Sequence, residues 1–181
     1  LNKSNKDINN LILATQNKSR VNDPIHNMYQ YPASFSPIFA KTIIANFSKE
    51  GDFILDPFMG GGTAILEGIR LGRNVIGNDI NSLSFFLSQT KSKKLSSKDR
   101  LILKKWLQNI IDNTDLSTVK KITASRTPKH MSNSSTKKYM SWIDFFILKT
   151  KKLKTKNQKN FSLLVLLRVS KRILDAHKKP L

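Results

Sequence analysis

Three adjacent glycines, Gly60 to Gly62, are separated by two residues from Asp56 and Pro57, which end a short apolar run. The chain has only seven glycines, and all of them lie within residues 51–77. Glycine adopts positive φ angles and lets another molecule approach the main chain. A run of three after a strand is therefore typical of a ligand-binding loop, although a glycine-rich surface turn has the same pattern.

The residues around this loop predict a strand–loop–helix–strand unit. Residues 52–56 have the pattern of a short buried strand, and residues 74–79 that of a second one. Residues 63–72 between them predict a helix that Thr63 caps and Gly72 ends. A unit of this length predicts two parallel strands joined by a right-handed crossover. The sequence therefore predicts an α/β fold with one clear βαβ unit.

Helical patterns account for most of the remaining chain. Residues 36–51 predict an amphipathic helix with Ser36 as its N-cap and Pro37 in the first position. Beyond the second strand four segments without glycine favour helix: residues 82–91, 96–112, 138–153 and 160–177. Residues 113–138, between the second and third of these segments, are polar and basic and predict a loop or a partly disordered segment. Trp142, Phe145 and Phe146 could stack on bases, but their helical spacing favours packing in a core.

Charge divides the chain into two unequal parts. Residues 1–85 carry 8 Lys and Arg against 7 Asp and Glu, whereas residues 86–181 carry 24 against 5, a net charge of +19. This split indicates a near-neutral part for a small molecule and a basic part for a polyanion. An AT-rich genome would produce the same excess of lysine without selection for binding. We expect a cofactor-binding part at 1–92 and a helical, Lys-rich insertion or target-contacting segment at 93–181.

Composition excludes several classes of protein. The chain has no cysteine and three scattered histidines, so disulfides and thiolate metal sites are excluded and a metal cage is not expected. No apolar run approaches the roughly 18 residues of a membrane span, and the polar start differs from a signal peptide. We therefore expect a cytoplasmic protein that makes no contact with a membrane.

Three classes of ligand use a loop at the carboxyl end of a parallel strand. A Walker-type phosphate loop needs a lysine after its glycines, and here Thr63, Ala64 and Ile65 follow them. A dinucleotide loop needs a third glycine where Ile65 stands, and the carboxylate of Asp56 would repel a pyrophosphate. S-adenosylmethionine has no phosphate and carries a cationic amino group that Asp56 would attract. Asp79, after the second strand, would accept hydrogen bonds from ribose hydroxyls or would cap the next helix.

Three segments in this order resemble the DNA amino-methyltransferase family, which modifies exocyclic amines of adenine or cytosine: residues 26–37, 55–68 and 77–84. The cofactor loop of that family has the form Asp-Pro-Phe-x-Gly-x-Gly-Thr, and all of its fixed positions occur here. A preceding His…Tyr-Pro-Ala-Lys-Phe-x-Pro element, which in the family helps to enclose the methionine end of the cofactor, is similar to His26 and residues 31–37. Ser34 stands where lysine is usual, which puts any charge contact of that lysine in doubt.

The resemblance implies a partial Rossmann-like methyltransferase fold, S-adenosylmethionine as cofactor and DNA as substrate. It also allows a cognate restriction endonuclease as partner. It assigns the cofactor to Tyr31, Pro32, Asp56, Pro57, Phe58, Gly60, Gly61, Gly62, Thr63 and Asp79.

One element of the family is absent from this chain. Methylation of a base amine needs Asp/Asn/Ser-Pro-Pro followed by an aromatic residue, and the chain contains no Pro-Pro, so no catalytic residue can be named. We expect a fragment that is inactive alone, with the missing element beyond Leu181. Three alternatives remain open: a fragment of a tRNA guanine amino-methyltransferase, which shares the loop, a non-enzymatic module that binds nucleic acid, and a nicotinamide oxidoreductase.

Overall fold

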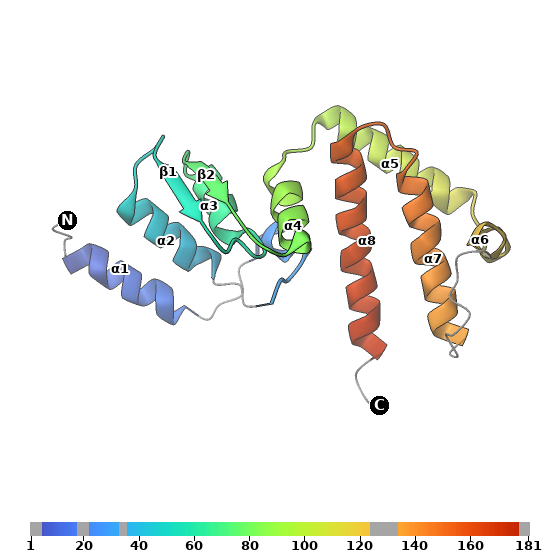
Figure 1. Cartoon of the computed structure of the whole chain (residues 1–181), viewed down its shortest axis with the longest axis horizontal. Helices are drawn as coiled ribbons and strands as arrows, with labels where there is room; N and C mark the ends of the chain where they lie inside the picture. The colour runs from blue at the N-terminus through green and yellow to red at the C-terminus, as the bar shows by residue number, and fades with distance from the viewer. Residues whose placement is uncertain (1–4, 18–21, 33–35, 124–133, 178–181) are drawn as a thin grey trace. The chain divides into compact units, whose positions relative to one another are not determined.

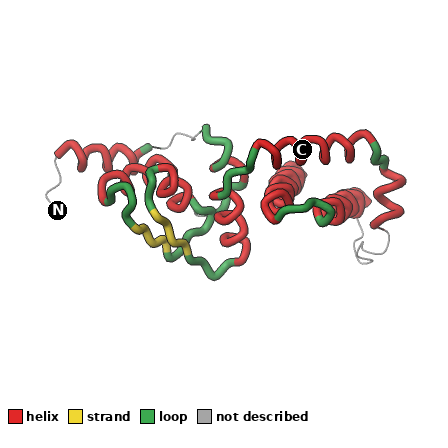
Figure 2. The backbone as a smooth tube through the Cα atoms, turned by 90° about the horizontal axis from the view of Figure 1, so that it is seen from above, coloured by secondary structure: helices red, strands yellow, loops and turns green. Residues whose placement is uncertain are grey.

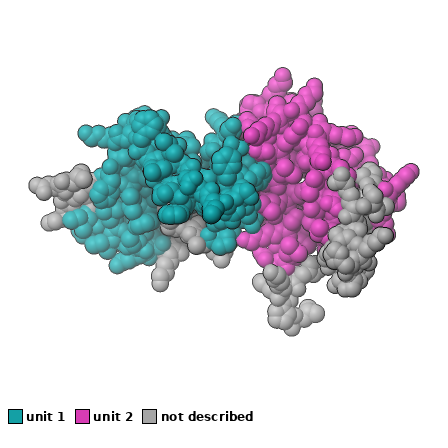
Figure 3. Space-filling model, in the orientation of Figure 1, with its two compact units in different colours: residues 1–94 teal, residues 95–181 magenta. Residues whose placement is uncertain are grey.

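The computed structural model describes residues 5–17, 22–32, 36–123 and 134–177. The chain divides into two compact units, residues 1–94 and residues 95–181, which Figure 3 draws in teal and magenta. Helix dominates both units, and the strands belong to the first (Figure 2). No helix within the described residues is long and apolar enough to span a membrane.

The first unit contains a βαβ motif flanked by helices (Figure 1). Its elements are α1 (Asn5–Gln16), the 3-10 turn η1 (His26–Met28), α2 (Pro37–Phe47), β1 (Phe53–Asp56), α3 (Thr63–Arg70), β2 (Asn74–Gly77) and α4 (Ser82–Ser92). Strands β1 and β2 pair in parallel, in a register that runs from Phe53 opposite Asn74 to Asp56 opposite Gly77. The predicted parallel pair is confirmed, and the carboxyl ends of both strands lie side by side.

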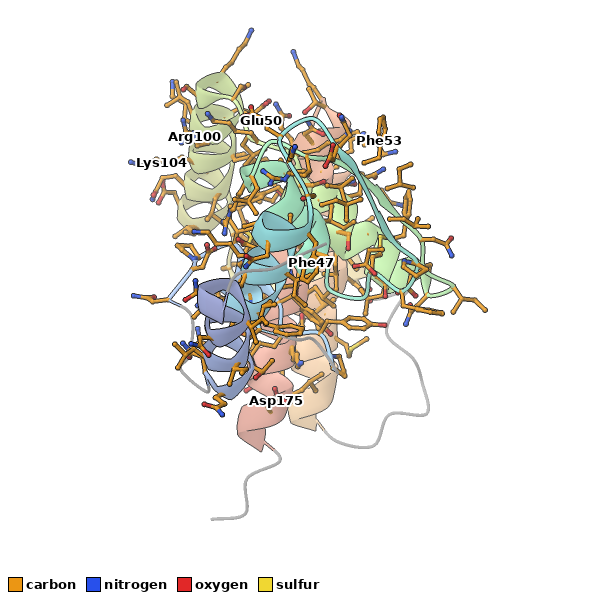
Figure 4. The ribbon with its side chains drawn as sticks, turned by 90° about the vertical axis from the view of Figure 1, so that its left-hand side faces the viewer. Phe47, Glu50, Phe53, Arg100, Lys104 and Asp175 are labelled. Carbon is orange, nitrogen blue, oxygen red and sulfur yellow. The ribbon has the colours of Figure 1, made fainter. Side chains whose placement is uncertain are left out.

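Helix α3 covers one face of this two-stranded sheet. The contact is close at Gly68, where an added Cβ would lie 2.6 Å from Cγ2 of Val75. The opposite face carries Phe53, Leu55 and Ile76, which are 76%, 66% and 55% exposed (Figure 4 labels Phe53). The described residues of the first unit therefore form a sheet that is covered on one side only.

The ends of two helices test the sequence reasoning in detail. Ser36 is the N-cap of α2, and its Oγ accepts a hydrogen bond from the backbone N–H of Ile38 at 3.2 Å, as expected. The prediction that Thr63 caps α3 was wrong, because the N-cap is Gly62 and Thr63 is the first helical residue. Helix α1 lies in a segment for which no structure was predicted.

The described residues of the second unit form helices and the turns that join them. Its elements are α5 (Ser97–Asp112), α6 (Leu116–Thr123), α7 (Ser134–Thr150) and α8 (Lys156–His177). Phe145 is fully buried in a cluster with Ile110 and Val119, and Trp142 and Phe146 pack against it, so the expected core role of these aromatics is confirmed. Helix α6 and the first residues of α7 correct the expectation of a loop or partly disordered segment at 113–138, of which residues 124–133 lie outside the described residues.

Candidate functional site

The glycine loop joins β1 to α3 and turns sharply. Gly60 and Gly62 have φ angles of 47° and 79°, in the left-handed region that favours glycine. The backbone N–H of Gly62 donates to the carbonyl of Met59 at 2.7 Å, and the carbonyl of Gly62 accepts from Leu66 at 3.0 Å in the first turn of α3. The loop thus directs the N-terminus of α3 toward the carboxyl ends of the strands.

The faces of these glycines are covered by the protein itself. An added Cβ at Gly61 would lie 2.9 Å from Cβ of Tyr31, and one at Gly62 would lie 2.5 Å from Oγ of Ser88 on α4. An added Cβ at Gly60 would also contact the ring of Tyr31, at 3.3 Å. Packing within the chain is therefore enough to require glycine at Gly61 and Gly62.

Tyr31 connects the segment before α2 to the loop. Besides its contacts with Gly60 and Gly61, its hydroxyl oxygen accepts a hydrogen bond from Nδ2 of Asn81 at 3.1 Å. The next residue, Pro32, is exposed. Ser34, the departure from the family pattern, lies outside the described residues.

Asp79 is held by the loop that it faces. Its Oδ2 accepts from the backbone N–H of Gly60 and its Oδ1 from that of Asn81, both at 2.8 Å. The hydrogen bonds from Asn81 and Gly60 stabilise the ionised form and hold the pKa of Asp79 below its ordinary value. The helix-cap interpretation of Asp79 was wrong for α4, since Asn81 is the N-cap and its Oδ1 accepts from Leu83 at 2.9 Å.

Asp56 ends β1 beside the same loop. Its Oδ1 accepts from the backbone N–H of Phe58 at 3.2 Å, and its carbonyl accepts from that of Asn78 at 2.9 Å. Phe58 is 86% exposed, and Ile80, next to Asp79, is completely exposed. Two partly exposed carboxylates and two exposed apolar side chains therefore follow the carboxyl ends of the strands, with Pro57 exposed and Thr63 buried between them.

A polar chain that the sequence did not reveal anchors residues 22–32 to α3. His26 Nε2 lies 2.7 Å from Oε1 of Glu67, which also accepts from Arg70 at 2.9 Å, and Arg70 pairs with Asp23 at 2.7 Å. Burial raises the pKa of Glu67, but the hydrogen bond from His26 and the charge of Arg70 outweigh it and lower the pKa overall. The hydrogen bond from Arg70 lowers the pKa of Asp23 to about 2. The ring of His26 therefore serves to hold this segment on α3.

Lys91 is a second residue that sequence reasoning missed. It extends from α4 beneath the loop, and its Nζ donates to the carbonyls of Gly61 at 3.1 Å and Tyr29 at 3.2 Å. The residue is only 8% exposed, and burial lowers the pKa of its ammonium group to about 8. Nothing in the local sequence distinguishes this lysine from the chain's many others, because its partners lie 30 and 62 residues away.

These contacts bring together most of the residues of the predicted site. Tyr31, the glycine loop and Asp79 are joined directly, and Asp56 joins them through the paired ends of the strands. Lys91 stabilises the loop through its bond to Gly61, and the His26–Glu67 pair holds residues 22–32 on α3. The arrangement offers a ligand hydrogen-bond acceptors, negative charge and apolar surface. Lys91, the buried cation among the described residues of the site, already donates its hydrogen bonds to backbone carbonyls.

The sequence of the first unit matches known proteins. Residues 2–90 match the family model N6_N4_Mtase, described as DNA methylase. The type II methyltransferase M.MjaII of Methanocaldococcus jannaschii is 30% identical over 90 residues, which are 50% of this chain and 16% of that protein. The type II methyltransferase M.BsoBI of Geobacillus stearothermophilus is 42% identical over 72 residues, 39% of this chain and 14% of the relative.

A third relative, the type II methyltransferase M.MvaI of Kocuria varians, is 40% identical over 70 residues, 37% of this chain and 15% of its own length. The chain therefore spans only about a sixth of the length of these curated relatives. The residues that match the family model, 2–90, contain the loop, both strands and Asp79. No solved structure matches the chain.

Proposed function

Residues 2–90 belong to the DNA methylase family, and from this premise we propose that the chain is the S-adenosylmethionine-binding portion of a DNA methyltransferase. The methyl group would go to an exocyclic amine of adenine or cytosine. The observation that carries the proposal is that the matched residues include the glycine loop and the carboxylates of Asp56 and Asp79, which the fold brings to one end of the sheet.

The chemistry of the site fits this cofactor. Asp79 is kept ionised and oriented by two backbone donors, and a carboxylate has about four acceptor positions, so acceptor positions remain for ribose hydroxyls. Asp56 supplies negative charge for the cationic amino group, and Phe58 and Ile80 supply exposed apolar surface for the adenine. When bound, S-adenosylmethionine provides a methyl group activated by its sulfonium. We assign binding to the ten residues predicted from the sequence, Tyr31, Pro32, 56–58, 60–63 and Asp79.

The wider architecture follows from the same proposal. We propose that the βαβ unit is part of a Rossmann-like methyltransferase sheet, with a cofactor-binding part at 1–92 and a target-contacting segment at 93–181. The division of the chain into compact units at Lys94 and Leu95 supports this arrangement. The family description and the names of the relatives favour DNA over tRNA as substrate, and they support a cytoplasmic enzyme with a cognate restriction endonuclease.

Methyl transfer requires more than these 181 residues. The chain has no Pro-Pro sequence, so it lacks the element that would receive the target amine and stack on the base. We therefore expect the chain alone to bind cofactor and to transfer no methyl group to DNA.

Calorimetric titration of the full chain with S-adenosylmethionine tests the proposal. The substitution Asp79→Asn keeps the shape of the side chain and removes its charge, and we expect binding to weaken by roughly 5- to 150-fold, because hydrogen bonds to a charged group contribute about 1–3 kcal/mol. Asp52→Asn is the matched control: Asp52 is exposed, precedes β1 and accepts a hydrogen bond from Lys49, at the opposite end of the strand from Asp56.

The titration also separates the alternatives. Tighter binding of NAD than of S-adenosylmethionine would favour a nicotinamide oxidoreductase. Absence of binding by the folded wild-type chain would remove the cofactor assignment and leave the nucleic-acid-binding module. Equal losses in the Asp79 and Asp52 variants would mean that charge in general, and not the position of Asp79, governs affinity.

A further inference from the structure

The turn between α7 and α8 carries the densest basic sequence of the second unit. We propose that this basic turn, residues 150–156, is a contact surface for the phosphate backbone of DNA. The inference rests on the proposed function, since that function supplies DNA as the polyanion. The inference goes beyond the proposed function because it assigns the DNA contact to seven residues, although every helix of the second unit carries basic side chains.

Side chains in the basic turn divide sharply by burial. Thr150 and Leu153 are 3% and 5% exposed, whereas the lysines at 151, 152, 154 and 156 are all exposed. Backbone hydrogen bonds from Lys152 to Lys149 and from Leu153 to Thr150, both 3.1 Å, close the turn tightly. The two buried residues therefore fix a short stretch of backbone from which four ammonium groups extend into solvent.

Gln158 fixes the second half of the turn. It is 2% exposed, its Oε1 accepts from the backbone N–H groups of Lys154 and Thr155, and its Nε2 donates to Oδ1 of Asp99 at 2.7 Å. The turn is thus tied to the first turn of α5 by a buried side chain. A surface whose backbone is ordered before binding loses less conformational entropy when it meets a ligand.

The charge around the basic turn is almost entirely positive. Between Asp144 and Asp175 the sequence contains nine Lys and Arg and no acidic residue. The carboxylate that Gln158 brings to the turn, Asp99, also accepts from Oγ of Ser96 at 2.8 Å, and basic side chains flank it in sequence. The positive end of the α8 dipole lies at the same turn and adds to the potential. The turn therefore complements a closely spaced row of phosphates.

The chemistry of lysine specifies which part of DNA is bound. Lysine is a compact point charge on a flexible stem, whereas arginine forms the bidentate contacts that read guanine. The exposed cations of the basic turn are all lysines. We infer contacts to phosphate that depend steeply on salt and little on sequence.

The test compares two variants of the full chain with equal charge loss. The first replaces the four exposed lysines of the basic turn with glutamine: K151Q, K152Q, K154Q and K156Q. The control replaces four exposed lysines of α5 and α6: K104Q, K105Q, K120Q and K121Q (Figure 4 labels Lys104). Circular dichroism confirms that both variants are folded, and duplex DNA binding is measured from roughly 50 to 200 mM salt.

Each lost phosphate contact lowers the log–log salt slope by about 0.9. We expect the slope of the basic-turn variant to fall by roughly 2–4 and that of the control by less than about 1. If the salt slope falls equally in the two variants, or does not fall in the basic-turn variant, the assignment is overturned. The lysine excess would then be attributed to the base composition of the genome. Stronger binding of the wild type to vesicles of anionic lipid than to duplex DNA would overturn it in favour of a membrane.

S-adenosylmethionine binding is measured on the same samples. If both variants bind the cofactor like the wild type while their salt slopes are equal, the assignment of the basic turn fails and the proposed function stands. If the wild type binds no cofactor, the proposed function fails whatever the slopes are.

Discussion

Replacing Gly62 by alanine tests the packing of the glycine loop directly. The residue has a φ of 79° and a ψ of 30°, so any side chain there adopts a left-handed backbone conformation. An added Cβ would lie 2.5 Å from Oγ, 3.0 Å from Cβ and 3.1 Å from Cα of Ser88. Rotation of the Ser88 side chain moves only its Oγ and leaves the close contacts with Cβ and Cα, so α4 must shift.

The expected cost has two parts. A left-handed conformation costs an ordinary residue about 1–2 kcal/mol. Overpacking against a buried neighbour costs typically a further 1–3 kcal/mol. We therefore expect Gly62→Ala to lower the free energy of unfolding of the first unit by roughly 2–5 kcal/mol, a large share of the stability of a small domain.

Gly51 provides a control with the same backbone and no neighbour. Its φ is 85°, and an added Cβ would meet nothing within 4 Å, so Gly51→Ala carries the conformational cost alone. Both tryptophans, Trp106 and Trp142, belong to the second unit, and their fluorescence would not report on this change. Hydrogen exchange of the paired amides of Asn74 and Asn78 is the suitable assay.

A double-mutant cycle identifies the cause of the loss. Ser88→Ala removes the atom at 2.5 Å and also the hydrogen bond from Ser88 Oγ to the carbonyl of Gly60, so alone it is expected to cost about 1 kcal/mol. In the Gly62→Ala background the same substitution should restore part of the stability, with a coupling above about 0.5 kcal/mol. Equal losses for Gly51→Ala and Gly62→Ala, or additive effects in the cycle, would refute the reasoning.

Two further predictions concern the charged groups of the first unit. Burial lowers the pKa of Lys91 from an ordinary 10.5 to about 8 in the folded state, so between these pH values the unfolded chain binds more protons than the folded chain. The free energy of unfolding should therefore rise with pH across that window by up to about 3 kcal/mol. Unfolding of Lys91→Met, measured over the same pH range, should lack this rise. The pKa of Asp23 is about 2, caused first by the hydrogen bond from Arg70, so Asp23 contributes stability that is complete above its unfolded pKa near 3.8 and is lost as pH falls toward 2. In Arg70→Met the NMR titration midpoint of the carboxyl should rise, and an unchanged midpoint would exclude Arg70 as the cause.

The sequence predicted the local part of this fold because local signals control it. The glycine cluster, the apolar runs around Asp56 and the Ser36–Pro37 helix start each depend on a few neighbouring residues, and the parallel pair followed from the short connection. Helices α1 and α6 were missed although their apolar residues recur at helical spacing, because more than half of the residues in each are polar.

The support of the site could not be predicted in the same way. The glycines indicated a loop that a ligand approaches, whereas the structure shows Tyr31 and Ser88 against Gly61 and Gly62. Lys91 and the His26–Glu67 pair act across 30 to 62 residues of sequence. Contacts of this kind depend on tertiary packing between residues that are distant in sequence. No local pattern in a single sequence indicates them.

The half-covered sheet has a consequence for the behaviour of the isolated chain. Within the described residues each strand has one neighbour, so β1 and β2 both leave an edge of backbone donors and acceptors without a partner strand. Both edges adjoin the face on which Phe53, Leu55 and Ile76 are largely exposed. Such an edge is a template for intermolecular β-pairing, and concentrated solutions are expected to aggregate through it. The substitution Leu55→Lys would discourage that self-association and leave the glycine loop intact.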